Sequence, residues 1–240
     1  MGLLRSHDAG HERHDPEHLE SLLGEYHDVH KGFHPESRAW KLLHALAFVL
    51  GGTTFISGTV ALFFPGYDTL SALLYTIGSC GFLSVDVQEF LTFEGAVLRA
   101  NIAMSLVGSS LYVVGSVGFF PSVFAWSPLI GIWGFILGSA VIGISQAIKT
   151  YRIGATNTDG AFSLRHLITD TDARTSAGVE TGACLGAWCF FFGTCLFNRG
   201  PLEGPDSVMQ TVLWTWVAGS CFFTLGSAFL CYRHFVMRVV

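Results

Sequence analysis

Six runs of mainly apolar residues restrict the fold of this chain more than any other feature. A helix needs roughly 20 apolar residues to cross the hydrocarbon core of a bilayer. Backbone amides and carbonyls find no water there, so each run must be helical. We therefore predict six membrane-spanning helices, at residues 43–64, 70–91, 98–120, 127–148, 180–197 and 209–231.

The composition agrees with this prediction and sets a polar N-terminal arm apart. Half of the 240 residues are hydrophobic and only 13% are charged, against about 25% in an ordinary soluble domain. Residues 1–41 nevertheless hold eight of the 18 acidic residues and seven of the ten histidines. We expect an all-α polytopic membrane protein with no nucleic-acid partner, because the chain has no basic run.

Lysine and arginine predict how the chain is oriented. Twelve of the 13 basic residues fall on one side of the six-span arrangement, and only Arg199 falls on the other. Basic residues are enriched on the inner side of membranes, so both termini are expected inside. We predict the mitochondrial inner membrane with the termini in the matrix. A thylakoid or a bacterial inner membrane is the alternative.

The spans form three pairs with one shared pattern, which indicates internal duplication. The first span of each pair has two glycines seven residues apart, with an aromatic residue four positions after the first glycine and a hydroxyl residue directly after the second. The second span carries a Gly-Ser pair. The glycines are Gly51, Gly58, Gly108, Gly115, Gly186 and Gly193 in the first spans and Gly78, Gly138 and Gly219 in the second spans.

Glycine at these positions predicts close helix contacts. Lipid tails are as apolar as leucine, so burying leucine gives helices little reason to associate. Glycine and serine instead let two backbones approach and gain dispersion contacts. We interpret the nine glycines as helix-packing seams. The alternative is that these small residues line a pore.

The repeated units read "GGTTFISGTVALFF…YTIGSCGFL", "GSSLYVVGSVGFF…WGFILGSAVIG" and "GAWCFFFGTCLF…WVAGSCFFTLG". This pattern resembles the YrhK-like domain over most of residues 45–235. The middle copy matches best, the first lacks the tryptophan before its Gly-Ser, and the third has a longer turn. The resemblance implies a small helical-hairpin membrane module, and it implies no defined activity, cofactor or catalytic residue.

These features divide the chain into six segments. They are a polar histidine-rich arm at 1–42, hairpins at 43–93, 94–150 and 179–235, an inner-side linker at 151–178 and a tail at 236–240. Within the arm, "DPEHLESLLGEY" predicts a short amphipathic helix, because Asp15 can cap it and Pro16 suits its first turn. The opening "MGLLRS" fits the myristoylation pattern at Gly2.

The arm holds a candidate metal site. His7, His11, His14 and His18 follow one another at steps of four, three and four residues, so they would share one face of a helix. Imidazoles at such spacing can bind zinc, copper or nickel. We favour a solvated or partner-docking segment instead, because no cysteine accompanies the histidines and glycine and proline interrupt the stretch.

A second candidate lies at the inner end of the second span. Acidic residues inside a membrane can form ion or proton sites. We favour an interfacial ion-pair cluster of Asp86, Glu89 and Arg99 that closes the bend between hairpins, because charge is less costly at span ends. His44 lies at the start of the first span and His234 just after the end of the sixth. Neither histidine is central in a span, which argues against a haem site with two central histidines.

No catalytic or cofactor-binding motif is present, so we expect a non-enzymatic protein without a cofactor. The expected role is an accessory subunit of a large membrane complex, specifically a mitochondrial respiratory-chain or ATP-synthase assembly. Its partners would be membrane lipids and other subunits, contacted by the many aromatic residues. The alternative is a small transporter or channel with an acidic inner-side site near Asp86 and Glu89.

Overall fold

The computed structural model describes residues 35–156, 161–204 and 206–237. Six of its helices are long and apolar enough to cross a membrane, and the described ranges contain no strand. These helices are α2 (Arg38–Ala61), α3 (Asp68–Thr92), α4 (Ala96–Gly118), α6 (Pro128–Ala155), α8 (Thr171–Arg199) and α9 (Met209–Cys231). The predicted all-α polytopic membrane fold is confirmed.

Three shorter elements join or extend the long helices. The helix α5 (Pro121–Trp126) lies in the turn between α4 and α6, and α7 (Leu164–Thr169) precedes α8. A π-helical turn, η1 (Tyr232–Met237), continues α9. Only the turn of the second hairpin is therefore elaborated into a helix within the described residues.

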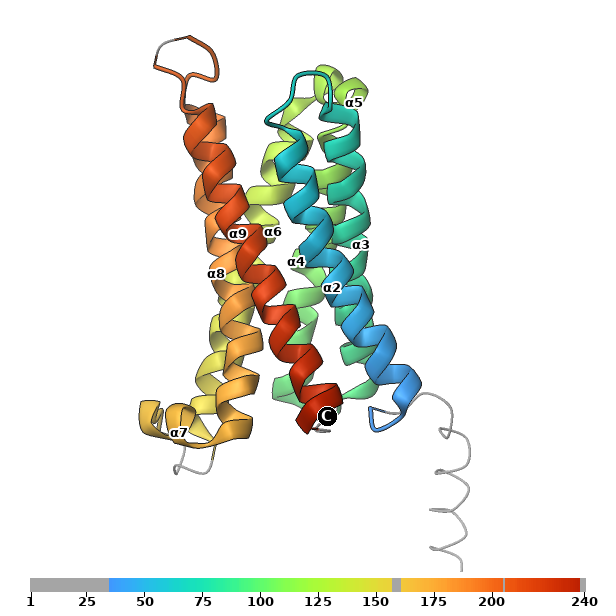
Figure 1. Ribbon diagram of the computed structural model, residues 1–240, viewed down its shortest axis with the longest axis vertical. Helices are drawn as coiled ribbons and strands as arrows, with labels where there is room; N and C mark the ends of the chain where they lie inside the picture. The colour runs from blue at the N-terminus through green and yellow to red at the C-terminus, as the bar shows by residue number, and fades with distance from the viewer. Residues whose placement is uncertain (1–34, 157–160, 205, 238–240) are drawn as a thin grey trace, which may run out of the picture.

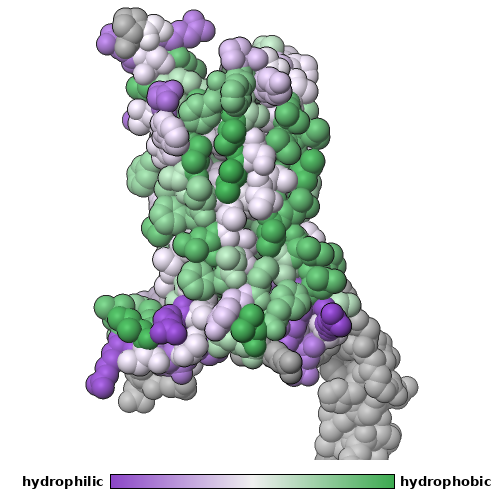
Figure 2. Space-filling model, viewed as in Figure 1, coloured by the Kyte–Doolittle hydropathy of each residue, from purple (hydrophilic) through white to green (hydrophobic). Residues whose placement is uncertain are grey.

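The six long helices form a closed ring of three hairpins (Figure 1). Helix α2 packs on α3, α4 on α6, and α8 on α9, and each hairpin also packs on the next. The ring closes where α9 returns to α2. One side of every long helix thus faces a common axis. Figure 2 shows apolar side chains over the outer surface between more hydrophilic ends, as expected for an integral membrane protein.

The described chain ends, at the start of α2 and in η1, lie at one end of the bundle (Figure 1). We call this the terminal end, and the end with the three hairpin turns the turn end. Among the described basic residues, only Arg199 belongs to the turn end, since it is the last residue of α8.

Helices at the terminal end are longer than the hydropathy pattern predicts. Helix α6 runs to Ala155 and α8 begins at Thr171, so much of the linker predicted at 151–178 is helical. Asp170 caps α8, because its side chain accepts a hydrogen bond from the Ala173 amide at 2.8 Å. Helix α2 likewise starts before the predicted arm boundary at 42, with Ser37 as its cap. These helical turns are polar, so hydropathy does not detect them.

Each hairpin is interlocked by side chains that fit over glycines. In each hairpin, the first of the two glycines in the first helix lies against a large side chain of the second helix. That side chain comes three residues after the serine of the Gly-Ser pair. A Cβ added to that glycine would lie under 3 Å from this side chain in all three repeats. The pairs are Gly51–Phe82 at 2.5 Å, Gly108–Ile142 at 2.5 Å and Gly186–Phe223 at 2.9 Å.

The other six glycines also make room for a large side chain of the partner helix. The glycine of each Gly-Ser pair accommodates the aromatic residue of the first helix, in the pairs Gly78–Phe55, Gly138–Tyr112 and Gly219–Phe190. The second glycine of each first helix accommodates a ring of the second helix, in the pairs Gly58–Tyr75, Gly115–Phe135 and Gly193–Trp216. All nine glycines singled out in the sequence thus face the partner helix of their own hairpin.

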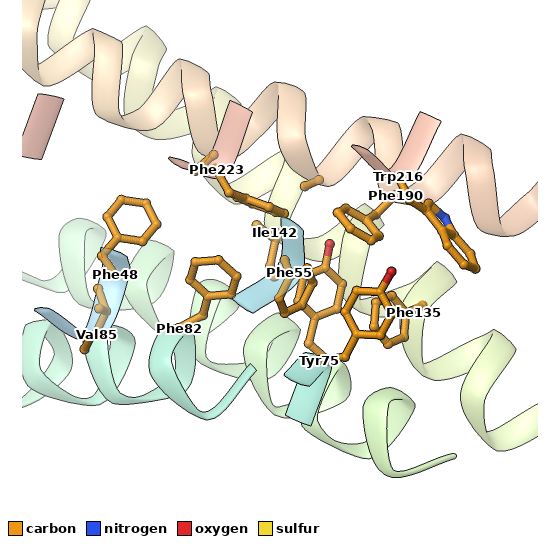
Figure 3. Close-up of a cluster of buried hydrophobic side chains, with 14 of the residues drawn as sticks. Phe48, Phe55, Tyr75, Phe82, Val85, Phe135, Ile142, Phe190, Trp216 and Phe223 are labelled. Carbon is orange, nitrogen blue, oxygen red and sulfur yellow. The ribbon is translucent and has the colours of Figure 1, made fainter. Parts of the chain in front are cut away.

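These side chains meet on the ring axis in a three-layered aromatic plug. Its turn-end layer is Tyr75, Phe135 and Trp216, its middle layer is Phe55, Tyr112 and Phe190, and its terminal-end layer is Phe82, Ile142 and Phe223. Phe55 is fully buried at the centre, with its ring centroid 5.0 Å from that of Tyr75 and 5.2 Å from that of Phe190 (Figure 3).

Replacing Gly78 by alanine is expected to destabilise the protein. The new Cβ would lie 2.5 Å from the ring of Phe55, and overpacking of this kind costs roughly 1–3 kcal/mol. Thermal unfolding of the detergent-solubilised protein should show a lower Tm for Gly78→Ala and no change for Ser57→Ala on an exposed face. Adding Phe55→Leu, which shortens the opposing side chain, should recover part of the loss. An unchanged Tm for Gly78→Ala would contradict the interlock.

Candidate functional site

Two cavities lie at opposite ends of the aromatic plug. The terminal cavity has a volume of about 340 Å³, and its walls include all three side chains of the plug's terminal-end layer. The turn cavity has a volume of about 310 Å³, and its walls include all three rings of the turn-end layer. Because equivalent residues of the three repeats line each cavity, both lie on the axis of the ring.

The terminal cavity is rich in ionisable side chains supplied by all three hairpins. They are His44 from α2, Asp86 and Glu89 from α3, Lys149 and Arg152 from α6, Glu180 from α8, and Arg233 and His234 from η1. Charged groups within membrane-spanning helices are costly and are retained mainly where they serve a function. This cavity is therefore the candidate functional site.

Lys149 is the centre of the charge network. Its Nζ lies 2.8 Å from Oε2 of Glu89 and 3.9 Å from Oε2 of Glu180. All three side chains are less than one-fifth exposed. One lysine from the second hairpin thus joins a carboxylate of the first hairpin to a carboxylate of the third.

A histidine pair continues the network toward the chain ends. Nδ1 of His44 lies 3.1 Å from Nε2 of His234, and Nε2 of His44 lies 3.5 Å from Oε1 of Glu89. Trp40 stacks on the His44 ring with centroids 4.5 Å apart, which fixes the imidazole plane. The path from His234 through His44, Glu89 and Lys149 to Glu180 is continuous across the bundle.

Asp86 lies one helical turn closer to the plug than Glu89. It is 7% exposed and forms no ion pair within 4 Å among the described residues. Gln146 lines the same cavity, and its amide oxygen is buried without a hydrogen-bond partner in the described part of the chain. The inner limit of the cavity therefore presents the Asp86 carboxylate, which the Ser109 hydroxyl contacts, and the amide oxygen of Gln146. Both groups can accept a hydrogen bond from water or contact a cation.

Comparison of the three repeats shows that packing does not require these charges. Ten residues after the Gly-Ser serine, the repeats carry Glu89, Lys149 and Leu230. Leu230 is a buried core residue at 4% exposure. An aliphatic side chain thus fills the position in the third repeat, so the charged pair is a specialisation of the first two repeats.

The predicted ion-pair cluster is wrong for two of its three members. Asp86 lines the cavity beside Glu89 but forms no ion pair within 4 Å among the described residues, and Arg99 does not line the cavity. Its guanidinium carbon lies 5.0 Å from the centroid of the Phe90 ring on an exposed face. The cation is Lys149 instead, because Lys149 of α6 lines the cavity while Arg99 lies on the exposed side of α4.

Sequence reasoning missed Lys149 and Glu180 as site residues, and it considered His44 and His234 only as haem ligands. The repeats contained a usable signal for the lysine, since counting from each Gly-Ser pair aligns Glu89 with Lys149. The contact of His44 with His234 depends on ring closure, which no local pattern reports.

Three predicted features lie outside the described residues. They are the candidate metal site of His7, His11, His14 and His18, the amphipathic helix and the myristoylation pattern at Gly2. Among the residues that the structure describes, no group of three or more His, Cys, Asp or Glu side chains is arranged to hold a metal ion.

Comparison of the chain with protein-family models, with curated proteins and with solved structures finds no match. The YrhK-like resemblance therefore stays a prediction.

The double substitution Glu89→Leu/Lys149→Leu should be more stable than either single substitution. Each single change leaves a buried charge without its partner, which typically costs about 3–5 kcal/mol. The double change copies Leu230 of the third repeat and removes both charges of the 2.8 Å pair, but it leaves Glu180 without Lys149. Thermal unfolding in detergent should therefore give low Tm values for the singles and a partly recovered Tm for the double. A double variant that merely sums the two losses would contradict the equivalence of these positions.

Proposed function

We propose that this protein conducts a small cation across the membrane along the ring axis, with the terminal cavity as the cation site. The observation that carries the proposal is a cavity of about 340 Å³ between membrane helices with three carboxylates in its wall. Asp86 is the innermost of these and has no ion-pair partner among the described residues. Lys149 acts on Asp86 from beyond ion-pair distance, so a cation reaching this depth could contact the Asp86 carboxylate directly.

The aromatic plug supports a gated path rather than an open pore. It separates the two cavities, so conduction requires its side chains to move. Hydroxyl contacts tie the plug in two hairpins, from Tyr75 to Thr59 at 2.6 Å and from Tyr112 to Ser139 at 2.9 Å. In the third hairpin the plug carries no hydroxyl, and the buried Thr194 hydroxyl finds no partner among the described residues. We expect the α8–α9 hairpin to move first.

The number of repeats favours a channel over a carrier. Alternating access usually involves two repeats that rock against each other around a central site. Three hairpins around one axis instead enclose a single path. Both ends of that path already contain a cavity, so displacement of a few plug side chains would join the cavities.

The accessory-subunit role stays a prediction. The lack of a catalytic motif in the sequence favours it. This role gives no reason for a charged cavity to which all three hairpins contribute, or for the charged Glu89 and Lys149 at a position where the third repeat has Leu230. The mitochondrial location, the inward orientation of both termini and the parent complex also stay predictions.

Purified protein in liposomes should pass potassium ions faster than protein-free liposomes do. The substitution Asp86→Asn should lower that flux on the order of tenfold, because it removes the carboxylate at the inner limit of the cavity, which forms no ion pair among the described residues. Flux can be measured with a potassium-sensitive dye. Glu94→Gln is the matched control, since Glu94 is exposed and does not line the cavity. Wild-type flux equal to the background, or full flux through Asp86→Asn, would refute the proposal.

Native electrophoresis of gently solubilised membranes tests the rival role. The conduction proposal predicts migration of this chain alone or as a small homo-oligomer. Co-migration with a large respiratory or photosynthetic complex, identified by mass spectrometry of the band, would instead favour the accessory-subunit role.

A further inference from the structure

The turn cavity differs in chemistry from the terminal cavity. Seven aromatic rings line it, with one acidic residue and no basic residue among the described lining residues. The rings are Tyr75, Phe119, Phe124, Phe135, Phe190, Phe197 and Trp216. The acidic residue is Asp68, the first residue of α3. Arg199, the described basic residue of this end, is not part of the wall.

The rings form a continuous aromatic wall drawn from several elements. The centroid of Phe119 lies 5.8 Å from that of Phe124 and 6.0 Å from that of Phe197. Phe197 in turn lies 5.7 Å from Trp216. The wall thus includes the end of α4, α5, α8 and α9.

Helix α5 extends this wall beyond what the repeat supplies. The repeat places Leu62, Phe119 and Phe197 at equivalent positions, four residues after the second glycine of each first helix. The extra helix in the second turn adds Pro121, Phe124 and Ala125 to the lining. Reversing the chain does not require a helix in the turn, since α2 and α3 of the first hairpin are joined without one.

We propose that the turn cavity binds a small organic ammonium ion, with a quaternary ammonium group of the size of choline as its best ligand. Aromatic faces attract alkylated ammonium groups through their quadrupoles, and the Asp68 carboxylate supplies the opposite charge at the wall. Among the described lining residues Asp68 carries the only formal charge, so the wall favours a cation. The buried Ser71 hydroxyl and Trp216 indole N–H have no hydrogen-bond partner in the described part of the chain and can donate to an uncharged oxygen of the ligand, such as the choline hydroxyl. Its volume of about 310 Å³ is at the lower limit of small-ligand pockets.

This site does not depend on the proposed conduction, because binding is measured without flux. Protein in nanodiscs of phosphatidylglycerol, which contain no choline headgroup, should bind choline in isothermal titration calorimetry. The neutral isostere 3,3-dimethylbutan-1-ol has the same shape and should bind at least tenfold more weakly. Equal binding of the two compounds, or no choline binding at millimolar concentration, would overturn the proposal.

Two pairs of variants test the walls. Asp68→Asn and Phe124→Leu should each weaken choline binding about 3- to 30-fold, the range expected for loss of a single favourable cation contact. Asp206→Asn and Trp126→Leu are the matched controls and should leave binding unchanged. Asp206 lies at the same end outside the wall, and Trp126 lies on α5 but is 80% exposed. Equal losses in variants and controls would also overturn the proposal.

A quaternary ammonium group can come from a free solute or from a lipid headgroup. The titration is therefore repeated in nanodiscs of phosphatidylcholine. Unchanged choline binding would assign the site to a free solute, and loss of choline binding would assign it to the lipid headgroup. Both results keep the ammonium chemistry of the site.

Discussion

The fit of a large side chain over a glycine is the interaction on which this structure depends. Helices in lipid gain little from burying aliphatic groups against one another, so association rests on close packing. Each hairpin here provides three glycines that admit three side chains of the partner helix, most of them aromatic rings. The gain is dispersion energy summed over many atom pairs. Without these contacts the rings would force the helices apart, and the plug that separates the two cavities would not form.

The same packing determines where polar groups can lie. The plug occupies the middle of the bundle, where an isolated charge would be most costly. Polar groups at this level are small hydroxyls, and Ser79 and Ser116 pair with each other at 2.8 Å between the first two hairpins. On the terminal-end side of the plug the residue types of the repeats differ, and Glu89, Lys149 and Leu230 occupy one equivalent position. Divergence is possible there because the interlock above it already holds the hairpins together.

The sequence predicted what depends on local pattern. Apolar length predicted the six spans, and the spacing of Gly51 and Gly58 and of their counterparts predicted the contact faces. It did not predict what depends on ring closure, such as the contact between His44 and His234. Nearness in the chain predicts Arg99 as the partner of Glu89, whereas the partner in the structure, Lys149, is 60 residues away. The helical turns after Asp170 were missed because they are polar.

The two cavities suit different kinds of cation. At the turn end, the wall attracts a cation through ring faces and a single carboxylate, which suits a weakly hydrated ion. At the terminal end, three carboxylates are balanced by Lys149 and its basic neighbours, which suits a hydrated ion that exchanges with water. An ion small enough to pass the plug need not be the ion that the aromatic cavity holds. An ammonium ligand bound at the turn end would then block the path, so choline should inhibit potassium flux from that side alone. The block is one-sided because the aromatic cavity lies on the turn side of the plug and the terminal cavity lies on the other side.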